Sequence, residues 1–142
     1  MPDVMDRLAN ASNGVVLLLG RLAMAAIFVP SGFNKLTHLD TFAASLAGRV
    51  PAAPYLFAVL GAATEFFGSI CVVLGFKTRY VALLMAVFTA IAALLSHHYW
   101  DMEEAARTAQ YIQFMKNVAI IGGFLILFAA GPGPYSLDRR GR

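Results

Sequence analysis

The sequence predicts an all-α membrane protein: a four-transmembrane-helix bundle with short helical segments in the two outer loops. Hydrophobic residues make up 59% of the 142 residues and charged residues only 13%, and the mean hydropathy is +0.68. This composition excludes an ordinary soluble domain. Four apolar runs are also long enough to cross a hydrocarbon core of roughly 30 Å. Runs such as VALLMAVFTAIAALL do not alternate as the strands of a membrane β-barrel would.

The four predicted membrane helices cover residues 13–33, 54–76, 79–96 and 115–130, and together they form one domain over residues 1–142. The turn GFKTR leaves only a few residues between the second and third helices, so these should be antiparallel neighbours. GPGPYSLD is a proline- and glycine-rich turn that stops the fourth helix. A phosphate-binding loop is disfavoured there because no further helix is expected.

Two outer connections, residues 41–51 and 101–114, each have room for a short helix. Tyr99, Trp100 and Tyr111 flank the second connection, as residues of an interfacial belt would. The N-terminal MPDVMDRLANAS is followed by no convincing cleavage site, so we expect the first span to be retained as its own insertion signal. Cys71, the one cysteine, lies in an apolar span, so an internal disulfide is excluded.

The orientation in the membrane follows from the basic residues outside the spans. Short loops rich in Lys and Arg stay in the cytoplasm, and the side with both termini holds six such residues against four on the other side. Both termini are therefore predicted to be cytoplasmic. The six are Arg7, Lys77, Arg79, Arg139, Arg140 and Arg142, and the four are Lys35, Arg49, Arg107 and Lys116.

Two charged residues, Arg21 and Glu65, interrupt apolar spans. An unpaired charge there costs about 2.5–3.5 kcal/mol or more. At about 1.5 Å per residue, Arg21 lies about 12 Å from the inner start of its helix and Glu65 about 16 Å from the outer start of its own, so their depths nearly coincide. We predict an Arg21–Glu65 pair near mid-membrane. This pair either fixes the helix order or serves a ligand site, in which Arg21 and Glu65 would be the catalytic candidates.

The stretch IFVPSGFNKLTHL closes the first span with unusual residues. Lys35 follows Arg21 by fourteen residues, about 40° short of four full turns, so both face roughly the same way. Pro30 and Gly32 predict that this end of the helix is kinked or unwound. Taken alone, Lys35 is more simply a lysine that extends to the membrane interface.

Other polar residues are expected at the same level as Lys35. The third helix closes with SHHYW and the fourth opens with QFMKN. We therefore predict a ligand-binding vestibule, bounded by Lys35, His97, Lys116 and Asn117, with Arg21 and Glu65 deeper. Its lysines and histidine could donate hydrogen bonds to the oxygen atoms of an anionic or quinone-like ligand.

Other chemistries have weaker support. His97, Asp101 and Glu104 have the i, i+4, i+7 spacing of a metal site if the helix continues past Trp100, but such spacing is common at helix ends, so we expect no metal. A bis-histidine haem is disfavoured because the three histidines lie at one surface. No nucleotide-binding motif is present, and we expect no nucleic-acid partner.

The order and spacing of five motifs resemble the DoxX family of small bacterial inner-membrane proteins. The motifs are GRLAMAAIFVPSGFNKL, ATEFFGSICVVLGFKTR, SHHYW, FMKNVAIIGG and GPGPYSLD. The resemblance implies a four-helix protein of the bacterial inner membrane, with relatives that include a subunit of a thiosulfate:quinone oxidoreductase and proteins linked to responses to quinones, thiols and oxidative stress. Matching positions in this sequence are Arg21, Lys35, Glu65, His97 and Asn117.

These observations favour a quinone-interacting membrane subunit or accessory of an oxidoreductase or redox-stress system, with quinone as the ligand. The chain has no visible electron carrier, so any enzymatic turnover would require a bound cofactor or a partner protein, with the chain as an oxidoreductase subunit. The alternatives are a small carrier for a weak acid or sulfur compound and a scaffold that docks soluble redox enzymes. Besides the lipid bilayer, we expect a redox partner protein or a second copy of the chain as partner.

Overall fold

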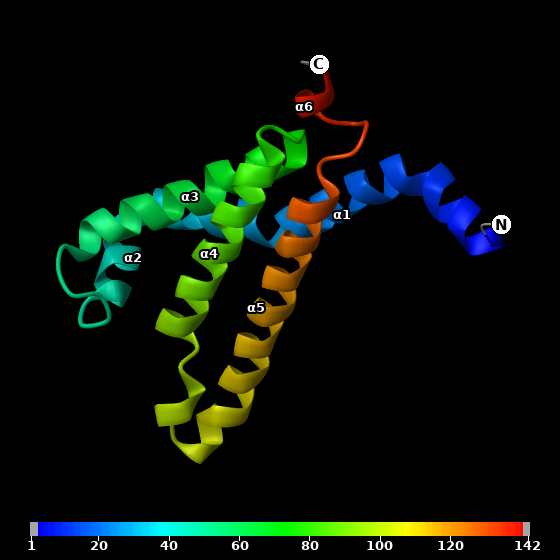
Figure 1. Cartoon of the computed structure of the whole chain (residues 1–142). Coiled ribbons are helices and arrows are strands. Elements are labelled where there is room, and N and C mark those ends of the chain that lie inside the picture. Colours follow the sequence, from blue (N-terminus) through cyan, green and yellow to red (C-terminus); the bar gives the residue numbers. More distant parts are fainter. Residues whose placement is uncertain (1–2, 141–142) are drawn as a thin grey trace.

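The computed structural model describes residues 3–140, and every regular element in this range is helical (Figure 1). Within it, four helices are long and apolar enough to cross a membrane, which confirms the predicted fold class. They are α1 (Val4–Thr37), α3 (Pro54–Leu74), α4 (Thr78–Ser96) and α5 (Glu104–Ala130). The outer connections hold α2 (Leu39–Leu46) and the 3₁₀ turn η1 (Tyr99–Asp101), and α6 (Leu137–Arg140) ends the described range.

Helix α1 extends beyond the predicted span at both ends. Asp3 and Asp6 form a capping box, in which each side chain accepts a hydrogen bond from the backbone N–H of the other. At the other end the helix continues through Pro30 to Thr37, so the predicted unwinding is wrong. A proline removes one backbone donor, and neighbouring helices make this tolerable in a membrane helix.

Gly32 has a different role from the predicted helix breaker. A Cβ at this position would lie 2.7 Å from the backbone nitrogen of Phe66 on α3. Only glycine therefore permits α1 and α3 to pack backbone to backbone here. Gly68 allows a similar approach, because the sulfur of Met85 on α4 lies 2.7 Å from the position that its Cβ would take.

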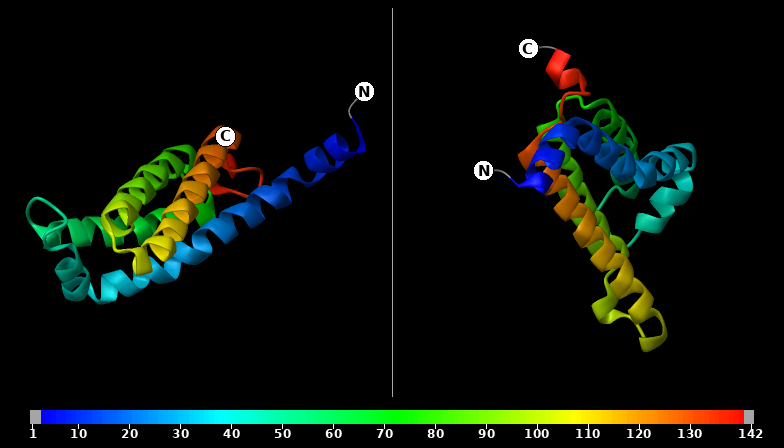
Figure 2. Two further views of the ribbon diagram at one scale, coloured as in Figure 1. Left: turned by 90° about the horizontal axis from the view of Figure 1, so that it is seen from below. Right: turned by 90° about the vertical axis from the view of Figure 1, so that its right-hand side faces the viewer.

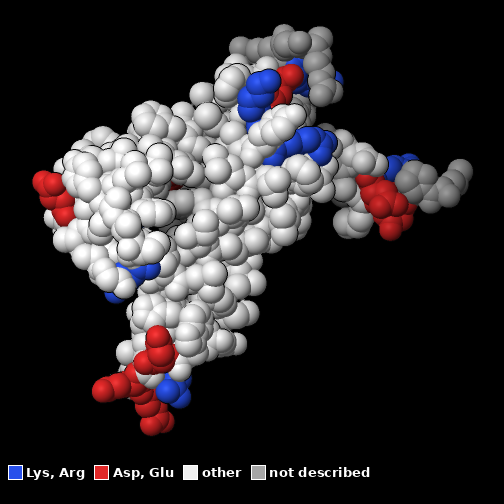
Figure 3. Space-filling model, turned by 60° about the vertical axis from the view of Figure 1, so that its left-hand side comes forward, with Lys and Arg blue, Asp and Glu red and all other residues white. Residues whose placement is uncertain are grey.

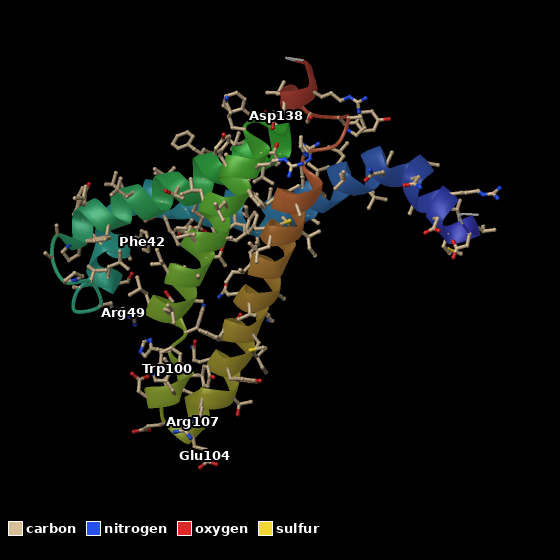
Figure 4. The ribbon with its side chains drawn as sticks, viewed as in Figure 1. Phe42, Arg49, Trp100, Glu104, Arg107 and Asp138 are labelled. Carbon is tan, nitrogen blue, oxygen red and sulfur yellow. The ribbon has the colours of Figure 1, made fainter. Side chains whose placement is uncertain are left out.

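Helix α5 begins at Glu104, well before the predicted start at residue 115. The segment EAARTAQYIQF is rich in good helix formers, which explains why it joins the membrane helix. In Figure 4, Trp100, Glu104 and Arg107 mark the tip where α4 turns into α5. The aromatic rings of Tyr99 and Trp100 pack on Phe114 at this tip.

The long helices form two pairs. Helix α1 packs along α3 and helix α4 packs along α5, while α3 and α4 touch over a shorter length. Figures 1 and 2 show that the pairs cross near the turn between α3 and α4 and diverge toward the opposite end. All four helices contribute to the core at the crossing, which includes Phe28, Val72, Met85, Phe124 and Leu127.

The segment of residues 131–138, here called the C-terminal clasp, folds back onto this crossing. The Asp138 carboxylate accepts hydrogen bonds from the backbone N–H groups of Lys77 (2.7 Å) and Thr78 (2.8 Å), and so caps α4. The Asp138 N–H donates to the carbonyl of Gly75. GPGPYSLD therefore stops α5, as predicted, and also ties the chain end to the α3–α4 turn (Figure 4).

Charged side chains gather at the ends of the molecule. Figure 3 shows Lys, Arg, Asp and Glu at the extremities of this view, with an uncharged surface between them. This distribution is what a membrane-spanning chain requires, because an unpaired charge is costly in hydrocarbon. Arg142, one of the residues used to predict orientation, lies outside the described residues.

Candidate functional site

Lys35 on α1 and Glu65 on α3 form an ion pair between two membrane-spanning helices. The Lys35 Nζ lies 2.5 Å from the Glu65 Oε2. Gly32 and Phe66 bring their two helices together one turn or less away. Lys35 also lies over the Phe42 ring of α2, 5.1 Å from its centre, where a cation is stabilised by the aromatic face.

The predicted Arg21–Glu65 pair is wrong. Arg21 is 1% exposed, and its guanidinium donates to the carbonyls of Val72 (3.4 Å) and Val73 (3.2 Å) and to that of Tyr135 in the clasp. A cation at the C-terminal end of α3 donates to carbonyls of the last helical turn and interacts favourably with the helix dipole. Arg21 therefore holds the clasp against α3 and does not touch Glu65.

A polar cavity of about 190 Å³ lies between α1, α3, α4 and α5, next to the ion pair. It brings together four of the predicted site residues: Lys35, Glu65, His97 and Asn117. Ser31, Thr89 and Ser96 also line it, with apolar walls from Ile27, Phe28, Phe88, Ala92 and Ile120. Hydrogen-bonding groups from four helices thus converge on one small space.

The polar groups of this cavity are held in place by contacts between neighbouring elements. His97, which follows α4 directly, pairs its Nδ1 with the Oε1 of Gln110 on α5 at 2.7 Å. Asn117 donates to the carbonyl of Gln113 through one hydrogen of its amide, so the other hydrogen remains for a ligand. Gln110 therefore positions His97, a role that sequence reasoning missed.

An apolar groove of about 330 Å³ lies next to the polar cavity. It runs between α2 and α3 on one side and α4 on the other, and Phe42 lies on its α2 side (Figure 4). Four residues line both spaces: Lys35, Phe88, Ala92 and Ser96. The two spaces are therefore neighbours, one with polar walls and one with apolar walls.

Lys116 and Arg21 line neither space, although both were candidates. Lys116 directly precedes Asn117, and a helix turns about 100° per residue, so its side chain points to a different face and is exposed. Among the missed residues, Ser31 precedes Lys35 by four positions and so shares its helix face. That spacing could have identified it.

The alternative metal ligands His97, Asp101 and Glu104 do not come together. Helix α4 ends at Ser96, before all three, so the helical register that their spacing required is broken. His98, not His97, lies near Asp101, at 3.7 Å. Within residues 3–140, no group of three or more His, Cys, Asp or Glu side chains could hold a metal ion.

Comparison with known proteins supports the membrane assignment. The DoxX family model matches residues 16–98. Similar proteins include inner membrane protein YphA of Escherichia coli (strain K12), 41% identical over 92% of this chain and 94% of the relative, and inner membrane protein YqjF of the same organism, 36% identical over 88% and 91%. Uncharacterized membrane protein Rv3486 of Mycobacterium tuberculosis is 28% identical over 94% and 86%. No solved structure matches. Four apolar helices and inner-membrane relatives identify a multi-pass inner-membrane protein.

Proposed function

The chain belongs to the DoxX family, and on this premise we propose that it is a quinone-interacting membrane subunit or accessory of an oxidoreductase or redox-stress system. One observation supports this most directly. A small cavity lined by the Lys35–Glu65 ion pair and several hydrogen-bonding groups adjoins an apolar groove between membrane-spanning helices. A quinone combines oxygen atoms that accept hydrogen bonds with a largely apolar body, so both parts of the site suit it.

The residues divide into two roles. Lys35, Ser96 and Asn117 carry N–H or O–H groups that can donate to the carbonyl oxygens of a quinone head group. Glu65 holds the Lys35 ammonium at the cavity wall and is a positioning residue. The same pair could also pass protons to a reduced head group, since a carboxylate and an amine are both able to carry them.

A redox function needs a source of electrons besides the quinone. The proposal therefore includes a partner protein or a bound cofactor that donates or accepts them. A second copy of the chain could also complete the assembly, because much of the apolar surface of α5 is exposed.

The test is mass spectrometry of small molecules extracted from gently purified protein. Native protein should carry near-stoichiometric quinone, and Asn117→Leu and Lys35→Met should lose it because each removes a donor from the cavity. Lys116→Met is the matched control, since Lys116 is an exposed lysine on the same helix as Asn117 and lies outside the cavity. Quinone that is absent from folded native protein, or unchanged in both cavity variants, would contradict the proposal.

A small carrier for a weak acid or sulfur compound is the second candidate. It is favoured by the Lys35 side chain, which is 30% exposed and offers a cation to an anion that reaches the cavity. Flux of such an anion into proteoliposomes that contain only this protein distinguishes the two functions. A redox subunit should show no flux, whereas a carrier should lose flux in Lys35→Met.

We also propose that both termini are cytoplasmic. The turn with Lys77 and Arg79 lies at the same end as the clasp, whereas the opposite tip carries Glu104 with Arg107 (Figure 4). A basic end in the cytoplasm agrees with the positive-inside rule. Fusion of each terminus to a reporter that is active only in the cytoplasm should give active protein, and activity of a periplasmic reporter would reverse the orientation.

A further inference from the structure

We propose that the apolar groove holds the single long apolar chain of the ligand, and that this chain enters sideways from the lipid between α3 and α4. The inference rests on the proposed function, because it takes the quinone head group to lie in the polar cavity. It adds the substrate class: the protein should bind quinones that carry a long prenyl chain in preference to quinones that carry none.

The residues that the groove shares with the polar cavity determine which end of the ligand lies where. Lys35 and Ser96 line both spaces, and Lys35 is the only charged residue among the described residues that line the groove. A head group bound near Lys35 therefore has its apolar substituent directed along the groove. The remaining walls are almost entirely apolar, which suits a hydrocarbon chain.

The rim of the groove faces the surrounding lipid. Leu60 on α3 and Ile91 on α4 both line the groove and are 55% and 52% exposed. The groove is lined mainly by α2, α3 and α4, and Figures 1 and 2 show α2 at the end of α3 that lies away from the turn between α3 and α4. A chain that resides in the bilayer can therefore reach the groove without passing through water.

The size of the groove favours one chain. At about 330 Å³ it lies at the lower end of the range of ligand pockets, roughly 300–1,000 Å³. This space suits the single prenyl chain of a quinone better than the two acyl chains of a phospholipid. We therefore commit to a single-chain occupant.

Gly61 on α3 keeps the groove open. A Cβ at Gly61 would lie 3.7 Å from Phe42 of α2 and 3.9 Å from Phe88 of α4, which are ordinary contact distances. A longer side chain would project into the space between these two rings. Gly61 lines the groove and not the polar cavity, so Gly61→Leu should block the chain and spare the head-group site.

The experiment compares quinones that share one head group and carry no prenyl unit, one unit or several units. Binding to protein in lipid nanodiscs is measured by mass spectrometry, with each quinone's partition into empty nanodiscs subtracted. Native protein should bind the long-chain quinone at least tenfold more tightly than the tailless one. Gly61→Leu should lose most of this gain and bind the tailless quinone within twofold of native protein.

Gly122→Leu is the matched control, because a Cβ at Gly122 on α5 meets nothing within 4 Å. It should bind every quinone as native protein does. If Gly61→Leu does not fold, Ile91→Trp narrows the same groove from its exposed rim. The inference would be overturned if a folded groove variant bound the long-chain quinone as native protein does. It would also be overturned if the variant lost a bound phospholipid and not a bound quinone.

Two outcomes separate this inference from the proposed function. If tailless and long-chain quinones bind native protein equally, the head-group site stands and the chain groove is wrong. If no quinone of any chain length binds folded native protein, the proposed function fails, and the occupant named here fails with it.

Discussion

The Lys35 Nζ lies 2.5 Å from the Glu65 Oε2, yet the two side chains differ in solvent exposure. The Lys35 side chain is 30% exposed and the Glu65 side chain only 4%. The lysine can reach the cavity and the membrane interface through its long stem. The carboxylate has no such route. The pair therefore joins α1 to α3 through a buried carboxylate and a lysine whose side chain can change its direction.

This asymmetry predicts unequal effects of removing either partner. Lys35→Met leaves a buried carboxylate without its cation and should cost about 3–5 kcal/mol. Glu65→Leu should cost less, because Lys35 can turn toward the interface. Thermal unfolding in one detergent, followed by circular dichroism, measures both variants.

The double variant Lys35→Met/Glu65→Leu should recover much of the stability lost in Lys35→Met, since no charge remains buried. Quinone binding should stay lost, because the cavity no longer has its lysine donor. Equal melting temperatures of the two single variants, or a double variant less stable than either, would show that burial of the carboxylate does not control stability here.

Arg21→Lys tests the clasp separately from the ligand site. A lysine lacks the planar fork that reaches the carbonyls of both Val73 and Tyr135, so stability should fall by about 2–3 kcal/mol. The folded fraction should retain quinone, because Arg21 does not line the cavity. Melting temperature and extracted quinone are the two measurements.

Arg79→Lys is a suitable comparison, because Arg79 also donates to helix carbonyls, those of Phe128 and Ala129, but is exposed. Arg79→Lys should lower the free energy of unfolding by less than about 1 kcal/mol. Loss of quinone from folded Arg21→Lys protein would return Arg21 to the list of ligand-site residues.

A comparison of Gly75→Ala with Gly48→Ala separates the cost of a steric clash from the cost of backbone strain. Both glycines have positive φ, 65° and 77°, so each alanine should cost about 1–2 kcal/mol of strain. At Gly75 the new Cβ would also collide with the Arg21 guanidinium and with Ser136, whereas Gly48 is open. Gly75→Ala should therefore be less stable by a further 1–3 kcal/mol, roughly, and equal melting temperatures would contradict the close packing of the clasp.

Asp138 should make the stability of the protein depend on pH in the acidic range. Burial raises the pKa of Asp138, but hydrogen bonds from Thr78 and Lys77 and the Lys77 charge outweigh it, so the pKa is lowered on folding. The carboxylate therefore stabilises the fold fully above its unfolded pKa of about 3.9, and this contribution is lost as pH falls through the lower folded value.

Asp138→Ala should accordingly cost about 1 kcal/mol at pH 7, with a smaller difference from native protein in strong acid. Melting temperatures across pH 2–7 measure the trend. Asp101→Ala, an exposed acid at the opposite tip, is the control. A difference that grows toward low pH would show that Asp138 does not cap α4 through its charge.

Much of the candidate site could be read from the sequence, because depth in a membrane follows from counting residues along apolar spans. Lys35, His97 and Asn117 were expected at one level, and all three line the polar cavity. Lys116 was expected there too and lies outside, because depth says nothing of helix rotation. Apolar residues that face lipid and those that pack inside look alike, so rotation cannot be taken from the pattern.

The sequence by itself determined the class of protein and its four membrane helices, since a bilayer requires long apolar helices whatever their arrangement. Only the tertiary structure decided which charges meet. Arg21 was expected at the depth of Glu65, but it lies at the C-terminal end of α3, where its guanidinium donates to the carbonyls of Val73 and of Tyr135 in the clasp. Close packing of α1 and α3 at Gly32 places Lys35 beside Glu65 instead. Pairing depends on crossing points and helix rotation, which are set by contacts between segments far apart in the chain.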